Sequence, residues 1–155
     1  MYDNVRPVSV PRPALAEHVS ALEAHIGCRM PAGYAEFVTR FGRGLLGGFV
    51  RIYTPDELLH GPSELASWRA RIDEYWFWDT GPLRKEQALE YVILGDTVGG
   101  DEFVFHPGEP DLIYVLSHDF DISYFAGRGL EAALAWLFKS GVLDEPFGDD
   151  TFEPY

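Results

Sequence analysis

The chain has 155 residues, of which 46% are hydrophobic and 15% aromatic, and its formal net charge is −13. This length fits one domain with a sizeable core, and the apolar content excludes general disorder. The charge disfavours nucleic acid as a ligand, because such binding relies on cationic side chains that neutralise phosphates. Since no apolar run could span a bilayer and residues 1–13 lack the apolar region of a secretory signal, we expect a cytoplasmic protein with no membrane partner.

The excess negative charge lies entirely after residue 85. Residues 1–85 carry ten acidic and ten basic side chains, whereas residues 86–155 carry fifteen acidic side chains against Arg128 and Lys139. A cationic partner is therefore favoured, and the alternative is that the acidity only maintains solubility.

Two helices are predicted first. Leu15, Val19, Leu22 and Ile26 recur at helical spacing between Pro13 and Gly27. A second helix is predicted from Pro31 to Gly42, and its core-facing stripe comprises Tyr34, Phe37, Val38 and Phe41. The glycines of residues 42–48 predict a loop, and the alternation in residues 49–53 predicts a strand.

Residues 54–59 read as a short helix with a capping box from Thr54 to Glu57. Helical spacing continues through Leu65, Trp68, Ile72 and Tyr75, and an aromatic run occupies residues 75–78. Four consecutive rings cannot all face one side of a helix, so at least one is expected to be exposed or to cover another element. Core filling and a partner-binding hot spot both remain open, with Trp76 and Trp78 as candidate anchors.

The second half predicts strands over residues 91–94, 102–106, 112–116 and 122–125. Their short connections imply antiparallel pairing. A last helix is predicted over residues 130–138 and is closed by Gly141. We expect one domain over residues 1–141 and an acidic tail over residues 142–155, either loose or laid over the domain by Phe147, Phe152 and Tyr155.

Residues 99–103, Gly-Gly-Asp-Glu-Phe, match the signature pentapeptide of diguanylate cyclases. However, residues 86–127 hold nine Asp and Glu and no Lys or Arg, so a nucleoside triphosphate would find no cationic side chain there. Thr97 and Val98 stand where that family has an arginine and an aromatic residue. We interpret the pentapeptide as a glycine-rich turn before a strand, in which Asp101 and Glu102 hold the turn and the strand start.

A metal site is the next alternative, because His106, His118, Asp119 and Asp121 lie in or beside turns. Their spacing matches no calcium loop and no zinc pattern, and such residues in turns more often cap backbone amides. The sequence also lacks a GxSxG elbow and a P-loop. We expect no catalytic residue, no metal and no cofactor.

The order of several short motifs resembles the SUKH superfamily, which includes fungal cell-wall-synthesis regulators and bacterial immunity proteins. The family's opening pair of helices is matched by Glu23, Ile26-Gly27, Met30-Pro31, Tyr34, Phe37 and Phe41-Gly42. The segment that enters the family's next helix is matched by residues 54–58. The family's strand-turn-strand centre resembles Ile93 to Asp96, Gly99 to Asp101, Phe103, Ile113-Tyr114 and His118-Asp119. The resemblance covers roughly residues 17–140.

This resemblance implies an α+β fold, a mainly antiparallel sheet with N-terminal helices and a C-terminal helix packed against it. It also implies a non-enzymatic immunity protein, or antitoxin, that binds and neutralises a cognate toxin such as a nuclease, and the excess negative charge favours a cationic one. The alternatives are a regulatory protein-interaction module of the same fold and, third, a nucleotide- or metal-dependent enzyme. The candidate partner-binding residues are Asp111, Asp119, Asp121, Trp76, Trp78, Asp144, Glu145, Asp149 and Asp150.

Overall fold

The computed structural model describes residues 1–61, 63–143, 148 and 150–155. The helices of this part are α1 (Ala16–Ile26), α2 (Tyr34–Arg40), α3 (Pro55–His60), α4 (Leu65–Glu74), α5 (Leu130–Lys139) and the short 3₁₀ helix η1 (Lys85–Gln87). The strands are β1 (Arg6–Pro7), β2 (Gly44–Leu46), β3 (Val50–Ile52), β4 (Val92–Thr97), β5 (Glu102–His106), β6 (Glu109–Leu116), β7 (Ser123–Arg128) and β8 (Thr151–Pro154). Among the described residues, no helix has both the length and the apolar character needed to cross a membrane.

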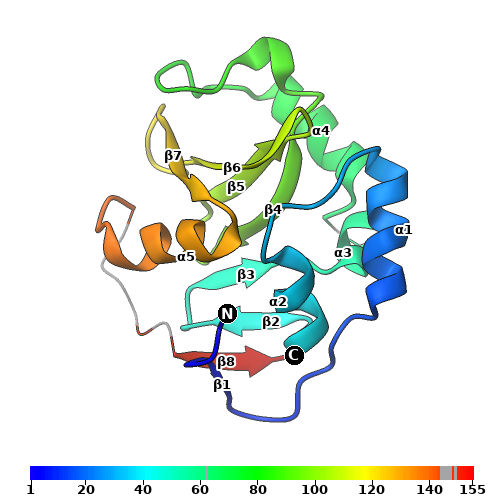
Figure 1. Cartoon of the computed structure of the whole chain (residues 1–155). Coiled ribbons are helices and arrows are strands. Elements are labelled where there is room, and N and C mark those ends of the chain that lie inside the picture. The colour runs from blue at the N-terminus through cyan, green and yellow to red at the C-terminus, as the bar shows by residue number, and fades with distance from the viewer. Residues whose placement is uncertain (62, 144–147, 149) are drawn as a thin grey trace.

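All eight of these strands form one sheet in the order β1-β8-β2-β3-β4-β5-β6-β7 (Figure 1). Every neighbouring pair is antiparallel except β1 and β8, which are parallel. The predicted α+β class is therefore confirmed, with helices packed on a mainly antiparallel sheet.

Helices cover both faces of the sheet at its β4–β7 half. Trp68 on α4 donates its indole N–H to Glu102 at the start of β5. On α5, the ring of Trp136 lies 5.7 Å from that of Tyr124 on β7, and Tyr124 shares a row across the sheet with Phe103. Because successive side chains of a strand point to opposite faces, Glu102 and Phe103 place α4 and α5 on opposite sides.

An aromatic cluster joins α2 to β8 and to the N-terminal segment. The Phe37 ring lies 5.0 Å from that of Phe41, and Phe152 lies 5.1 Å from Phe41. Tyr2 closes the cluster at 5.3 Å from Phe37. Phe37 and Phe41 are 1% and 0% exposed, so the predicted burial of both rings is confirmed.

Several predicted bounds are wrong. The strands predicted over residues 91–94, 112–116 and 122–125 are β4 (Val92–Thr97), β6 (Glu109–Leu116) and β7 (Ser123–Arg128). Helix α2 begins at Tyr34 and not at Pro31, because Gly33 has φ +89° and so interrupts any right-handed helix before it. Residues 42–48 are not only a loop, since Gly44–Leu46 form β2. A Cβ at Gly44 would collide with the Phe152 ring, so this glycine allows β8 to approach β2 closely.

The end of the chain belongs to the sheet. Residues Thr151–Pro154 form β8 between β1 and β2, and Phe152 is 1% exposed. Tyr155 is exposed and lies 5.3 Å beneath the Arg43 guanidinium. Part of the expected acidic tail is thus a structural strand, whereas Phe147 lies outside the described residues.

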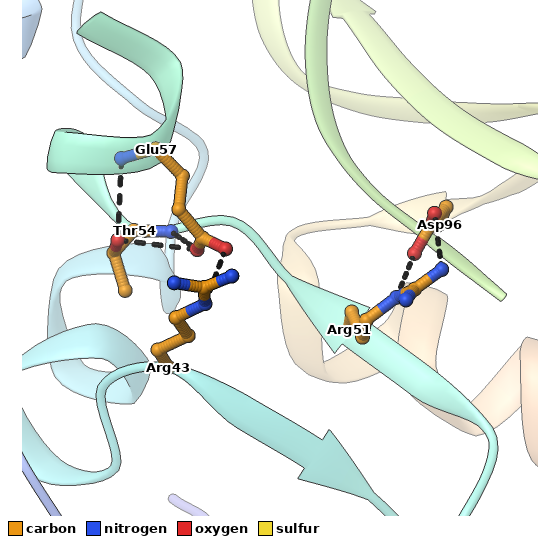
Figure 2. Close-up of polar contacts among 5 residues, drawn as sticks. All are labelled: Arg43, Arg51, Thr54, Glu57 and Asp96. Atoms are coloured by element: carbon orange, nitrogen blue, oxygen red, sulfur yellow. Dashed lines mark hydrogen bonds and ion pairs between the residues drawn. The ribbon is translucent and has the colours of Figure 1, made fainter. Parts of the chain in front are cut away.

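The capping box predicted for the third helix is present. Glu57 N donates to Thr54 Oγ1 at 3.4 Å, and Thr54 N donates to Glu57 Oε2 at 2.8 Å. Figure 2 shows both bonds, together with the Arg43 guanidinium that lies 3.1 Å from the Glu57 carboxylate. These contacts fix the start of α3 after β3.

Candidate protein-binding surface

Asp111 lies on β6 and is fully engaged within the molecule. Its two carboxylate oxygens accept from Arg29 at 2.8 Å each, and Oδ1 also accepts from Ala32 N at 2.9 Å. These hydrogen bonds, first that from Arg29 and then that from Ala32, lower the pKa of Asp111 to about 2. Asp111 therefore anchors the connection between α1 and α2, and its charge is already matched.

Further acidic residues of the second half are paired in the same way. Figure 2 shows the Arg51 guanidinium forked onto Asp96, with N–O distances of 2.6 and 2.7 Å. Arg71 on α4 donates to both carboxylate oxygens of Glu102 at 3.0 Å. Ion pairs therefore neutralise part of the excess negative charge of the second half, because arginines of the first half contact carboxylates of the second.

The pentapeptide forms the turn between β4 and β5. Asp101 is 8% exposed, and it accepts from Thr97 Oγ1 at 2.7 Å and from His118 N at 2.8 Å. Glu102 is the first residue of β5. The interpretation of these two residues as a turn and a strand start is confirmed, and Asp101 also ties this turn to the one that follows β6.

A hollow of about 310 Å³ opens between α4 and strands β3 to β5. Its lining includes Tyr53, Trp68, Arg71, Asp96 and Glu102. The charged groups in this lining belong to the ion pairs just described, so the hollow offers little net charge to a ligand. Burial raises the pKa of Tyr53, which remains a neutral hydroxyl at physiological pH.

No group of three or more His, Cys, Asp or Glu side chains is arranged to hold a metal ion in the described part of the chain. The side chains of His118, Asp119 and Asp121 are all exposed in the turn after β6. Exposure leaves these three side chains accessible from outside the molecule.

The aromatic run after α4 divides between core and surface. Trp78 is 5% exposed and its indole N–H donates to Ser117 O at 2.7 Å. Trp76 is half-buried, with its ring 5.4 Å from Trp78 and 6.3 Å from Tyr91. Trp78 is thus a core residue and not the exposed anchor that the sequence suggested, because its polar atom finds its partner inside the fold.

The exposed rings of this run are Tyr75 and Phe77, which are 66% and 42% exposed. The Phe77 ring lies against that of Trp78, with 4.3 Å between the ring centroids and 31° between the ring planes. The buried tryptophan therefore serves as a support for Phe77 and holds its ring at the surface.

Asp119 and Asp121 lie in the turn between β6 and β7, and both are exposed. This turn is bonded to the segment after Trp78. Thr80 N donates to Asp121 O at 3.1 Å, and Ser123 N donates to Thr80 O at 2.8 Å. In Figure 1 the green connection between α4 and β4 accordingly passes beside the yellow turn before β7.

We call residues 77–80 and 117–122 together the turn surface. Its exposed side chains include Phe77, Asp79, Asp119, Phe120 and Asp121, and Phe120 is 48% exposed. Within the described residues, the carboxylates of Asp79, Asp119 and Asp121 accept no hydrogen bond and form no ion pair. The turn surface thus combines exposed rings with unmatched negative charge.

Asp150, near the C-terminus, is not brought to this surface. Asp150 is exposed, and its carbonyl accepts from Arg6 N at 2.8 Å beside β8. Five strands of the sheet lie between β8 and β7 (Figure 1). Asp144, Glu145 and Asp149 lie outside the described residues.

Sequence reasoning missed Phe77, Asp79 and Phe120 as members of one surface. The signal for Phe120 was its place between Asp119 and Asp121, because an apolar ring inside a polar turn often has no core to enter. No local pattern could link this turn to Phe77 and Asp79, since the connection is made by backbone hydrogen bonds between distant segments.

Residues 13–135 match the model of the SMI1/KNR4 family, SUKH-1. The chain belongs to this family. The match confirms the resemblance to the SUKH superfamily that the short motifs indicated. No curated protein and no solved structure matches the chain.

Membership is consistent with an immunity-type or SMI1/KNR4-type protein-interaction domain. The arrangement at the turn surface agrees with such a role, because exposed rings beside unpaired carboxylates suit contact with another protein. The turn surface is therefore the candidate functional site.

Proposed function

We propose that this protein is a cytoplasmic immunity protein that binds and neutralises a cognate protein toxin with a cationic active-site groove, such as a nuclease. The proposal rests on one observation above the others. The turn surface presents the carboxylates of Asp79, Asp119 and Asp121, which have no hydrogen-bond or ion-pair partner in the described part of the chain, and the net charge of the chain is −13. Such a surface would attract a basic protein and could cover the groove that binds its anionic substrate.

The SUKH-1 match supports a role in binding, since the family is generally non-catalytic. The ion pairs around Asp96, Glu102 and Asp111 support it as well. They engage these three carboxylates in the fold, so these three are not available to a partner.

A growth assay tests the proposal. The gene encoded beside this one would be expressed in a host cell with and without this protein. We expect growth to stop when the neighbouring product is expressed alone and to resume when both are present. If the neighbouring product is harmless, or if it kills despite this protein, the proposal fails. A stable complex with a harmless neighbour would instead assign a regulatory interaction module.

The electrostatic part has its own measurement. Association with the purified toxin should be fast at low salt and slower at high salt, because exposed charges act over roughly 8–10 Å at moderate ionic strength. The variant Asp119→Asn/Asp121→Asn should associate more slowly than the native chain. A control of equal charge change, Glu17→Gln/Glu153→Gln on α1 and β8, should associate at nearly the native rate. Equal slowing in both variants would show that only net charge matters.

A further inference from the structure

We propose that the exposed rings of Phe77 and Phe120 on the turn surface form the docking site for an arginine-rich segment of a protein partner. The assignment rests on the proposed function and names the part of the surface and the side-chain chemistry that would engage. The two rings are 42% and 48% exposed, although large aromatic side chains are usually covered in a folded domain.

Hydrogen bonds hold this surface in one arrangement. The Ser117 hydroxyl contacts Phe120 O at 2.7 Å and Ile122 O at 2.9 Å. Trp78 lies under Phe77 and is itself bonded to Ser117 O at 2.7 Å. Because both rings are carried on bonded segments, a partner would lose little free energy in ordering them.

The chemistry of these side chains selects arginine. A guanidinium group stacks on the face of an aromatic ring, where it is attracted by the negative charge of the π system. Its N–H groups remain free to donate in a fork to a nearby carboxylate, and Asp79, Asp119 and Asp121 are unpaired among the described residues. A lysine ammonium is more strongly hydrated and offers no planar fork, so it should bind more weakly.

The surrounding charges fit a cationic occupant. Within this surface His118 is the basic side chain, while Arg71 nearby is already bonded to Glu102. Arg84 and Lys85 lie farther along the same connection, after Leu83, whose N–H donates to Ser123 Oγ at 3.2 Å. A second copy of this chain is disfavoured as the occupant, since each copy carries a net charge of −13.

A synthetic peptide of alternating arginine and glycine can probe the site on the full chain. Backbone amide shifts would be followed by NMR at low salt during the titration, with a lysine–glycine peptide of equal length in parallel. We expect the largest shifts in residues 77–80 and 117–122, and several-fold tighter binding of the arginine peptide. Shifts spread evenly over all acidic segments, equal affinity for both peptides, or no binding would overturn the proposal.

The variant Phe77→Ala/Phe120→Ala should bind the arginine peptide with about tenfold lower affinity, as expected for the loss of two cation–π contacts. Tyr155→Ala is the matched control, because Tyr155 is 54% exposed and follows β8, which five strands separate from β7. It should leave the affinity unchanged. If the double variant binds as tightly as the native chain, or if Tyr155→Ala weakens binding equally, the assignment is wrong.

The growth assay separates this proposal from the function on which it rests. If Phe77→Ala/Phe120→Ala folds and still protects cells as the native protein does, the docking site is wrong while the immunity function stands. If the native protein protects against no neighbouring product but the arginine peptide still maps to the turn surface, the function is wrong and the docking site stands.

Discussion

The α2–β8 region and the turn surface use the same kinds of side chain with opposite results. Around α2, Phe37, Phe41 and Phe152 are at most 1% exposed. On the turn surface, Phe77 and Phe120 are about half exposed. The first region joins segments from the start, middle and end of the chain, which cover one another, whereas the second consists of two adjoining loops. The number of elements that meet at a site, and not the residue type, decides whether a ring becomes core.

Carboxylates follow the same contrast. Asp111 is held by Arg29 and by the amide of Ala32, and its charge maintains the fold. Asp119 and Asp121 have no such partner within the described residues. Buried rings and paired carboxylates should therefore control the stability of the fold, whereas exposed rings and unpaired carboxylates should control the binding of a partner.

The largest difference is expected between two phenylalanines. Phe41→Ala should lower the free energy of unfolding by about 3–5 kcal/mol, because it removes a ring from a closed cluster and leaves a cavity. Phe77→Ala should change it by less than about 1 kcal/mol, since its ring is 42% exposed. Urea unfolding of both variants measures the difference. Equal losses would mean that the turn surface is a second core region.

The next effect concerns the paired carboxylate. Asp111→Ala should lower the free energy of unfolding by about 1–2 kcal/mol, because the Arg29 fork and the bond from Ala32 N are lost. Glu109→Ala is the control on the same strand and should stay within about 0.5 kcal/mol, since Glu109 is exposed. A similar loss in both variants would show that strand propensity, and not the ion pair, explains the change.

A smaller effect of the same group should depend on pH. The pKa of Asp111 is lowered to about 2 in the folded chain, against about 3.9 in an unfolded one. Its contribution is thus complete above about pH 5 and is lost as the pH falls towards 2. We expect about 1 kcal/mol, since water partly screens a side chain that is 23% exposed. Asp111→Asn should therefore differ most from the native chain at pH 6 and progressively less towards pH 3; a constant difference would contradict this.

Removal of the unpaired charges should hardly affect stability. Asp119→Asn/Asp121→Asn should stay within about 0.5 kcal/mol of the native free energy of unfolding, with any change towards higher stability, because self-repulsion decreases. Thermal unfolding at low salt is the most sensitive measurement. A loss above about 1 kcal/mol would reveal that these carboxylates support the turn, and would weaken the contrast with Asp111.

We expect no binding of GTP, and hence no heat of binding when GTP is titrated into the protein. Asp101 is occupied by Thr97 and His118, and Glu102 by Trp68 and Arg71, so neither carboxylate is available to a magnesium ion. Calorimetry with GTP and Mg²⁺ checks this on the native chain. Micromolar binding that is lost in Asp101→Ala would restore the cyclase alternative.

Local patterns in the sequence were sufficient for the elements whose causes are local. Helical spacing located α1, α4 and α5, and the capping box at Thr54 located the start of α3. The buried stripe with Phe37 and Phe41 was also predicted, because a helix repeats every 3.6 residues whatever its surroundings. The turn at Asp101 was recognised for the same reason, since glycines and a short polar side chain form turns by themselves.

Only the tertiary structure decided which groups meet across long stretches of chain. Asp111 and Arg29 are separated by 82 residues, and nothing local distinguishes this carboxylate from Asp119 or Asp121. The insertion of β8 between β1 and β2, and the contact of Thr80 with Asp121, are likewise set by how the whole sheet closes. Local propensity depends on neighbours along the chain, whereas pairing and exposure depend on the packing that all elements reach together.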